Sequence, residues 1–185
     1  MRQAAHKSRA IAPASEQRER ERPRPPGAVV GVLDSAEQAR HAIDRLEHSG
    51  FDASKLSVIG RELPSADHQI GIAVIGVHAN VWGRHGALWK RLAEAPAAMA
   101  LAWVPYIGHV VAIGPAACAL AGSSWVARAG PQASALERIL SLTGLPAGKV
   151  RCYEDAVRAG RFLLLVHGDP SDAAAALRVL GGGEL

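Results

Sequence analysis

The sequence predicts an α+β fold in which helices cover a small sheet, and three observations support this prediction. The front of the chain alternates an apolar run, an amphipathic segment and a second apolar run, which is typical of strand, helix and strand. The back has helix, strand and helix around the apolar run Arg161–His167. Between the two halves, Ala95–Ala127 contains no Asp, Glu, Lys or Arg over 33 residues. Together the halves fit a ferredoxin-like sandwich interrupted by a hydrophobic insertion.

Residues 1–27 are predicted to form a disordered tail, because they end in RERERPRPPG and show no apolar periodicity. Residues 1–26 hold seven Arg or Lys and three Glu, which equals the whole net charge of +4. The remaining residues carry fourteen charges of each sign, so we expect no binding to nucleic acid. The tail also lacks the apolar core of a secretory signal, and a cytoplasmic protein is expected.

In the front half we expect three strands, over Ala28–Leu33, Lys55–Gly60 and Ile70–Val77. A helix between the first two is capped by Asp34 or Ser35 and ends at Gly50. Its apolar face consists of Ala39, Ala42, Ile43 and Leu46. No glycine-rich phosphate loop follows the first strand, so the sequence lacks a nucleotide-binding fingerprint.

In the back half we expect helices over Ala133–Leu142 and Lys149–Ala159, followed by the buried strand Arg161–His167. A last helix begins at Pro170, because proline suits the first helical position. Glycines end this helix, and residues 181–185 are expected to be flexible. The ferredoxin-like domain then spans residues 28–180.

The uncharged segment is predicted to form the centre of an Ala/Gly-rich hydrophobic helical hairpin, which is inserted over residues 82–130. Pro105 and Pro115 divide it into a short helix over Ala97–Val104 and a second helix from Pro115 to Ala127. These pieces measure roughly 12 and 20 Å, whereas a helix that crosses a bilayer needs about 20 residues. A kinked span remains an alternative, but we favour burial of the hairpin against other copies of the chain.

Small residues provide the candidate packing face of this hairpin. Gly114, Cys118 and Gly122 recur every four residues, which lets two helix backbones approach closely. An ordinary alanine-rich core helix would show the same pattern. For His109, a hydrogen bond to a backbone carbonyl is the simpler interpretation, and contact with a quinone or lipid headgroup is the functional one. The other candidate oligomer or lipid contacts are Trp103, Tyr106 and Trp125.

Polar pairs elsewhere in the chain do not predict a catalytic site. The candidates are Asp34 with His41, Glu154 with Asp155, and His167 with Asp169. They fall on helix surfaces or strand ends, where charged residues usually cap helices or face solvent. The histidines His68, His78 and His85 have no Cys or carboxylate at ligand spacing. We therefore expect no enzyme activity, no cofactor and no metal.

Four segments carry a resemblance to a known family. In order they are VVGVLDSAEQARHAIDRLEHSGFDASKLSVIGRE, WGRHGALW, WVPYIGHVVAIGPAACALAG and YEDAVRAGRFLLLVHGDPSDAAAALRVL. This pattern resembles the general stress protein 17M-like domain family of bacteria, from Ala28 to about Leu180. The resemblance implies a ferredoxin-like body with a hydrophobic insertion and a link to stress responses. It implies no catalytic residues.

The sequence therefore favours a non-enzymatic, self-associating scaffold or a stress-type protein peripheral to the inner membrane. The alternative is an oligomeric stalk or carrier module whose hairpins line an apolar chamber. That chamber would bind a lipid or a quinone for a partner redox enzyme. The two hypotheses differ in whether the apolar face is filled by another copy of the chain or stays hollow.

Overall fold

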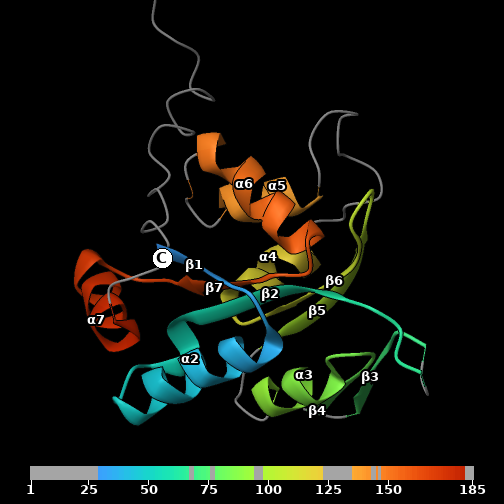
Figure 1. The fold of residues 1–185 in the computed structure, drawn as a ribbon, viewed down its shortest axis with the longest axis horizontal. Coiled ribbons are helices and arrows are strands. Elements are labelled where there is room, and N and C mark those ends of the chain that lie inside the picture. The colour runs from blue at the N-terminus through green and yellow to red at the C-terminus, as the bar shows by residue number, and fades with distance from the viewer. Residues whose placement is uncertain are drawn as a thin grey trace, which may run out of the picture.

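A computed structural model of the chain describes residues 29–66, 69–75, 78–93, 98–122, 135–142, 145 and 147–181. The predicted tail and Trp125 lie outside these residues. Figure 1 labels the elements along the chain. In order they are β1 (Val29–Leu33), α2 (Ala36–His48), a 3₁₀ turn (Ala53–Lys55), β2 (Leu56–Glu62), β3 (Gly71–Ile75), β4 (His78–Trp82), α3 (Gly86–Leu92), β5 (Met99–Val104), β6 (Gly108–Ile113), α4 (Pro115–Gly122), α5 (Ala135–Leu142), α6 (Ala147–Arg158), β7 (Phe162–Val166) and α7 (Pro170–Leu180).

The first helix forms as the sequence predicts. Ser35 caps α2, because its hydroxyl oxygen accepts the N–H of Gln38 at 3.1 Å. Gly50 follows the helix with a φ of +79°, a left-handed conformation that suits glycine. The buried residues of α2 are those of the predicted apolar face: Ala39, Ala42, Ile43 and Leu46.

The back half also confirms its predicted elements. Every residue of β7 is buried, as its continuous apolar run indicates. At the start of α7, the Asp169 carboxylate accepts two backbone N–H groups while the Asp172 carboxylate accepts the Asp169 N–H. Pro170 occupies the first turn, and Gly181 ends the helix with a φ of +92°.

Five strands form one antiparallel sheet in the order β1-β7-β2-β6-β5. The register pairs Val58 of β2 with Leu164 of β7 on one side and with Ile113 of β6 on the other. Strands β3 and β4 form a separate two-stranded sheet. The α+β class is therefore confirmed, and β5 is one outer strand of the main sheet.

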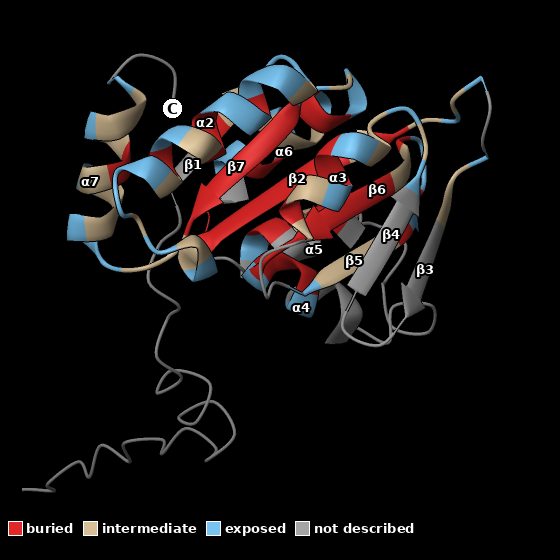
Figure 2. Cartoon of the chain, turned by 90° about the horizontal axis from the view of Figure 1, so that it is seen from below, coloured by how far each residue is buried: buried red, intermediate tan, exposed pale blue. Residues whose placement is uncertain are grey.

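Helices cover both faces of the main sheet (Figures 1 and 2). One core contains residues of α2, α3 and α7, packed against alternate residues of the strands such as Val58 and Leu164. The other core contains residues of α4, α5 and α6, packed against the residues between them, such as Ile59 and Leu163. We call these two faces the α2 face and the α6 face.

The chain makes two crossover connections between parallel strands. The connection from β1 to β2 passes over β7, and the connection from β6 to β7 passes over β2. The connection β1-α2-β2 passes over the α2 face, whereas the connection from β6 through α6 to β7 passes over the α6 face. In this strand order, two right-handed crossovers would both lie on one face. The two crossovers therefore have opposite hands. The ferredoxin-like assignment is not confirmed, because helices lie on both sides of the sheet.

The structure corrects the predicted helical hairpin. Met99–Val104, which includes most of the first predicted helix, is strand β5, and the following residues return as β6. Only the second helix begins as predicted, at Pro115. The hairpin is thus a β-hairpin and part of the main sheet rather than an insertion, because β6 pairs with β2 along its length. Among the described residues, no helix combines the length and the apolar character needed to cross a membrane.

Candidate functional site

The tip of the β5–β6 hairpin exposes an aromatic side chain. The Ile107 N–H donates to the Val104 carbonyl oxygen at 3.1 Å, which closes a turn with Pro105 and Tyr106 at its centre. Tyr106 has a φ of +64°, a left-handed conformation usually taken by glycine at this position of a turn. That conformation costs a non-glycine residue roughly 1–2 kcal/mol. The Tyr106 side chain is 93% exposed and belongs to neither core.

A row of three side chains crosses the sheet near the same end. The register places Trp103 opposite His109, and His109 opposite Glu62. Directly opposed residues of antiparallel strands project from the same face, here the α2 face. Trp103 at the outer end is 55% exposed, whereas Glu62 at the inner end is 1% exposed. The row therefore runs from solvent into the core.

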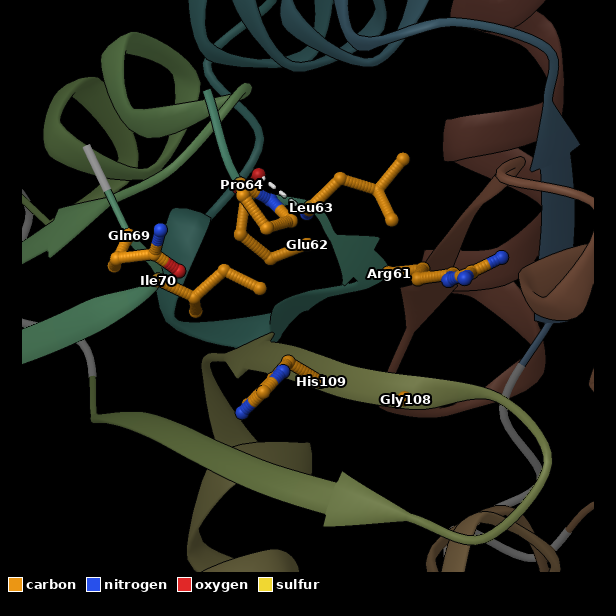
Figure 3. A pocket seen from close by; sticks show the side chains of 8 residues that line it. All are labelled: Arg61, Glu62, Leu63, Pro64, Gln69, Ile70, Gly108 and His109. Carbon is orange, nitrogen blue, oxygen red and sulfur yellow. Dashed lines mark hydrogen bonds between the residues drawn. The ribbon is translucent and has the colours of Figure 1, made fainter. Parts of the chain in front are cut away.

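A recess of about 260 Å³ adjoins this row. In Figure 3, His109, Gln69 and Ile70 border the recess, whereas Arg61 extends away from them. The residues that line the recess include charged, polar and apolar groups: Arg61, Glu62, Leu63, Pro64, Gln69, Ile70, Gly108 and His109. The described residues contain no group of three or more His, Cys, Asp or Glu side chains placed to hold a metal ion.

The predicted small-residue face does not form on one helix. Gly114 is a buried residue before α4, with a φ of +85°. A Cβ at this position would lie 2.0 Å from the carbonyl oxygen of Leu56. Cys118 is exposed on α4, and Gly122 is the last residue of that helix. Gly114 therefore permits the close approach of its own chain to β2.

Glu62 is a buried residue at the end of β2. Its carboxylate forms hydrogen bonds with helix α3 and with the residue that precedes this helix. It accepts the backbone N–H groups of Leu63 at 2.8 Å and His85 at 3.0 Å, and the indole N–H of Trp89. The His85 Nδ1 atom lies 3.5 Å from a Glu62 oxygen. Gly83 provides the necessary space, since a Cβ there would lie 2.6 Å from the Glu62 carboxyl carbon.

The hydrogen bonds to Glu62 keep it ionised. Burial raises the pKa of the Glu62 carboxyl, but the hydrogen bonds from His85, Leu63 and Trp89 together outweigh burial, and the pKa lies below 4.5. A carboxylate that accepts several donors in this way is a structural anchor. Its oxygens form hydrogen bonds within the protein rather than with solvent.

A second polar group is buried at the other end of β2. The Ser57 hydroxyl oxygen accepts the backbone N–H of Ala116 at 2.9 Å and lies 2.8 Å from Nε2 of His167. This geometry fits a neutral ring protonated on Nδ1, to whose Nε2 the hydroxyl donates. Burial lowers the pKa of His167 below 6.5. Ser57 is 1% exposed, and its hydrogen bond with Ala116 links α4 to the sheet.

The His167 contact predicts a dependence of stability on pH. The folded protein holds His167 neutral, and the unfolded chain takes up a proton more readily below pH 6.5. We therefore expect the free energy of unfolding to fall as the pH drops through and below that value. Urea unfolding between pH 7.5 and 5 measures this. His167→Gln should remove part of the pH dependence, and an unchanged slope in that variant would contradict the assignment.

The polar pairs considered for catalysis serve other contacts. His41 lies 3.7 Å from Glu37 rather than beside Asp34, and Asp155 pairs with Arg158 at 2.6 Å. Asp169 caps α7, as described above. The His167 ring contacts the hydroxyl of Ser57, which is 1% exposed.

Sequence reasoning missed the buried roles of Glu62 and Ser57. A signal for Glu62 was present, because Leu56, Val58, Gly60 and Glu62 alternate along one strand and project from one face. The predicted strand ended at Gly60, so Glu62 was not included in the alternation. For Ser57 no local signal exists, since both of its partners come from distant segments.

Comparison of the chain with family models, with curated proteins and with solved structures finds no match. The resemblance to the general stress protein family stays a prediction.

Proposed function

We propose that this protein is a non-enzymatic, self-associating scaffold that assembles through the β5–β6 hairpin. The observation that supports this proposal is the composition and exposure of the hairpin at the edge of the sheet. From Met99 to Ile113 it contains no charged residue, and it exposes Trp103 and Tyr106. A link to stress responses rests on the family resemblance alone.

Edge strands of monomeric proteins are usually protected against association. Charged side chains, prolines within the strand, bulges or a covering segment prevent their pairing with another sheet. Strand β5 has no charge and no proline over its six residues, and its register with β6 is continuous. Among the described residues it pairs with β6 alone. These features favour an edge that is used for assembly.

The exposed aromatic residues favour the same conclusion. Tryptophan and tyrosine are enriched where protein surfaces become buried on binding, because they bury a large area at low cost in side-chain entropy. Tyr106 takes a conformation in which glycine would be favoured by roughly 1–2 kcal/mol. Backbone strain of this kind is characteristic of functional positions.

The polar groups of the described residues support a non-enzymatic role. The buried Glu62 and Ser57 are held by hydrogen bonds to the fold, and the recess beside His109 has a mixed polar lining. The carrier alternative requires an apolar chamber that forms between copies. Mass spectrometry of the purified assembly for bound lipid or quinone tests it directly.

Trp103→Lys tests the proposed assembly. We expect the wild-type protein to exceed its monomer mass of 19.4 kDa in light scattering at micromolar concentration. A lysine on the edge strand should raise the dissociation constant at least about tenfold, because a charged side chain there disfavours strand pairing and loses hydration when a second copy covers it. The melting temperature of the monomer should change little, since Trp103 is more than half exposed.

The matched control is Ala174→Lys, which adds the same charge at an exposed position of α7. It should leave the assembly intact. A wild-type protein that stays at 19.4 kDa at all concentrations would contradict the proposal.

A further inference from the structure

The hydrogen bonds of β5 determine which of its backbone groups point away from the sheet. The Gly114 N–H donates to the Ala98 carbonyl oxygen at 2.8 Å, and this pair continues the register of Met99 opposite Ile113. In an antiparallel ladder, hydrogen-bonded and non-hydrogen-bonded pairs alternate. Ala100, Ala102 and Val104 therefore bond to β6. The outward N–H and C=O groups of the strand belong to Met99, Leu101 and Trp103.

These three residues also share a face of the sheet. Leu101 and Met99 pack against the core of the α2 face, and Trp103 follows in the same alternation. No hydrogen bond from their N–H groups to another described segment is present. The outer edge of β5 is thus a short template, with an outward donor and acceptor at every second residue.

This template is complementary to itself. When two β5 strands run antiparallel with Leu101 opposite the second copy's Leu101, Met99 comes opposite the second copy's Trp103. Each outward N–H then faces an outward carbonyl of the other strand. A twofold axis perpendicular to the sheet keeps the α2 faces of both copies on the same side. The thioether of Met99 then lies against the indole of the second copy's Trp103, a favourable contact.

Two alternative registers are less favourable. A shift of two residues in one direction places Met99 opposite the second copy's Pro105, which has no N–H to donate. A shift of one residue would put side chains of opposite faces together. The Leu101-centred register uses all three outward positions. It also brings no two charges together, because the strand has none.

We propose that the partner at this edge is a second copy of the chain, joined by antiparallel pairing of β5 about Leu101. The two five-stranded sheets then form one continuous sheet of ten strands. This inference rests on the proposed self-association and adds its geometry: an isologous dimer that buries Trp103.

Cysteine cross-linking of the full chain tests the register. The background carries Cys118→Ser and Cys152→Ser, because both native thiols are exposed. In it, Leu101→Cys should form a disulfide-linked dimer when oxidised glutathione takes up the two thiol electrons. The two Leu101 residues form a hydrogen-bonded pair in this register, and such pairs have Cα atoms about 5.5 Å apart, which lies within the range of a disulfide. Non-reducing electrophoresis should show twice the mass of 19.4 kDa.

Met99→Cys is the matched control on the same edge and face. In the proposed register, Met99 lies opposite Trp103 of the second copy, and that copy's Met99 is four residues further along its strand. The two Met99 residues are therefore roughly 13 Å apart, beyond the reach of a disulfide. This variant alone should cross-link at least about tenfold more slowly than Leu101→Cys. Mixed with Trp103→Cys, it should cross-link readily between unlike copies.

The outcomes separate this inference from the proposed function. A protein that assembles while Met99→Cys cross-links as fast as Leu101→Cys has another register, and the inference is wrong although self-association stands. Open-ended polymers with no Leu101→Cys dimer would indicate pairing of unlike edges and would also overturn it. A protein that is monomeric at every concentration contradicts both. Thermal melts of each variant confirm that the fold is intact.

Discussion

Replacing Glu62 with alanine is expected to lower the free energy of unfolding by about 3–5 kcal/mol. The change removes the shared acceptor of two backbone N–H groups and of the Trp89 indole N–H in a site that is 1% exposed. Each buried donor without an acceptor costs about 1–3 kcal/mol. Urea unfolding at pH 7 measures the loss.

Two variants control this prediction. Glu62→Gln keeps one acceptor oxygen and should cost less than Glu62→Ala. Glu37→Ala removes a carboxylate that is largely exposed on α2 and should change stability by less than about 1 kcal/mol. Because the Glu62 pKa is lowered, its contribution is present above pH 4.5 and is lost as the pH falls below that value. Equal stabilities of Glu62→Ala and wild type at pH 7 would contradict the anchor role.

Gly114→Ala is the second substitution with a large expected effect, and it should cost about 3 kcal/mol or more. The added Cβ would meet the Leu56 carbonyl oxygen at 2.0 Å, and the φ of +85° is strained for any side chain. The backbone of β2 or of the turn must shift to admit it. Thermal unfolding of the variant measures the cost.

Gly148→Ala is the matched control, because it makes the same chemical change in α6, where a Cβ meets nothing within 4 Å. There alanine should raise stability by about 0.5–1 kcal/mol through its helix propensity. The comparison also tests the original hypothesis of a helix-packing face. If Gly114→Ala kept its full stability but lost its assembly, contact between copies rather than contact with β2 would explain that glycine.

Most local elements of this fold could be predicted from residue patterns, because the signals are short-range. Ser35 and Gly50 delimit α2, and Asp169 with Pro170 begins α7, through contacts within a few residues. The buried run Phe162–Val166 identifies a central strand by hydrophobicity alone. Of the contact residues that the sequence suggests, Trp103, Tyr106 and His109 lie together on the β-hairpin, whereas Gly114 lies against β2.

The prediction of a helical hairpin was wrong, because the segment forms strands whose partner cannot be recognised from a local sequence pattern. Alanine-rich segments without charges suit a buried helix, and Ala97–Val104 has little that excludes one. The β-branched residues at Val110, Val111 and Ile113 favour a strand, but this preference is weak without a partner. The partner is β2, which lies about fifty residues earlier in the chain and supplies the register of β6.

The sequence by itself determined the α+β class, the ends of the capped helices, the central strand and the uncharged stretch that contains Trp103 and Tyr106. Those properties depend on neighbours along the chain and on hydrophobicity. Only the tertiary structure decided that the stretch is a β-hairpin, that helices cover both faces, and that Glu62 and Ser57 are buried. It also decided that the outward groups of β5 belong to Met99, Leu101 and Trp103. The physical reason is the same in each case: strand pairing and polar burial depend on contacts between segments distant in sequence.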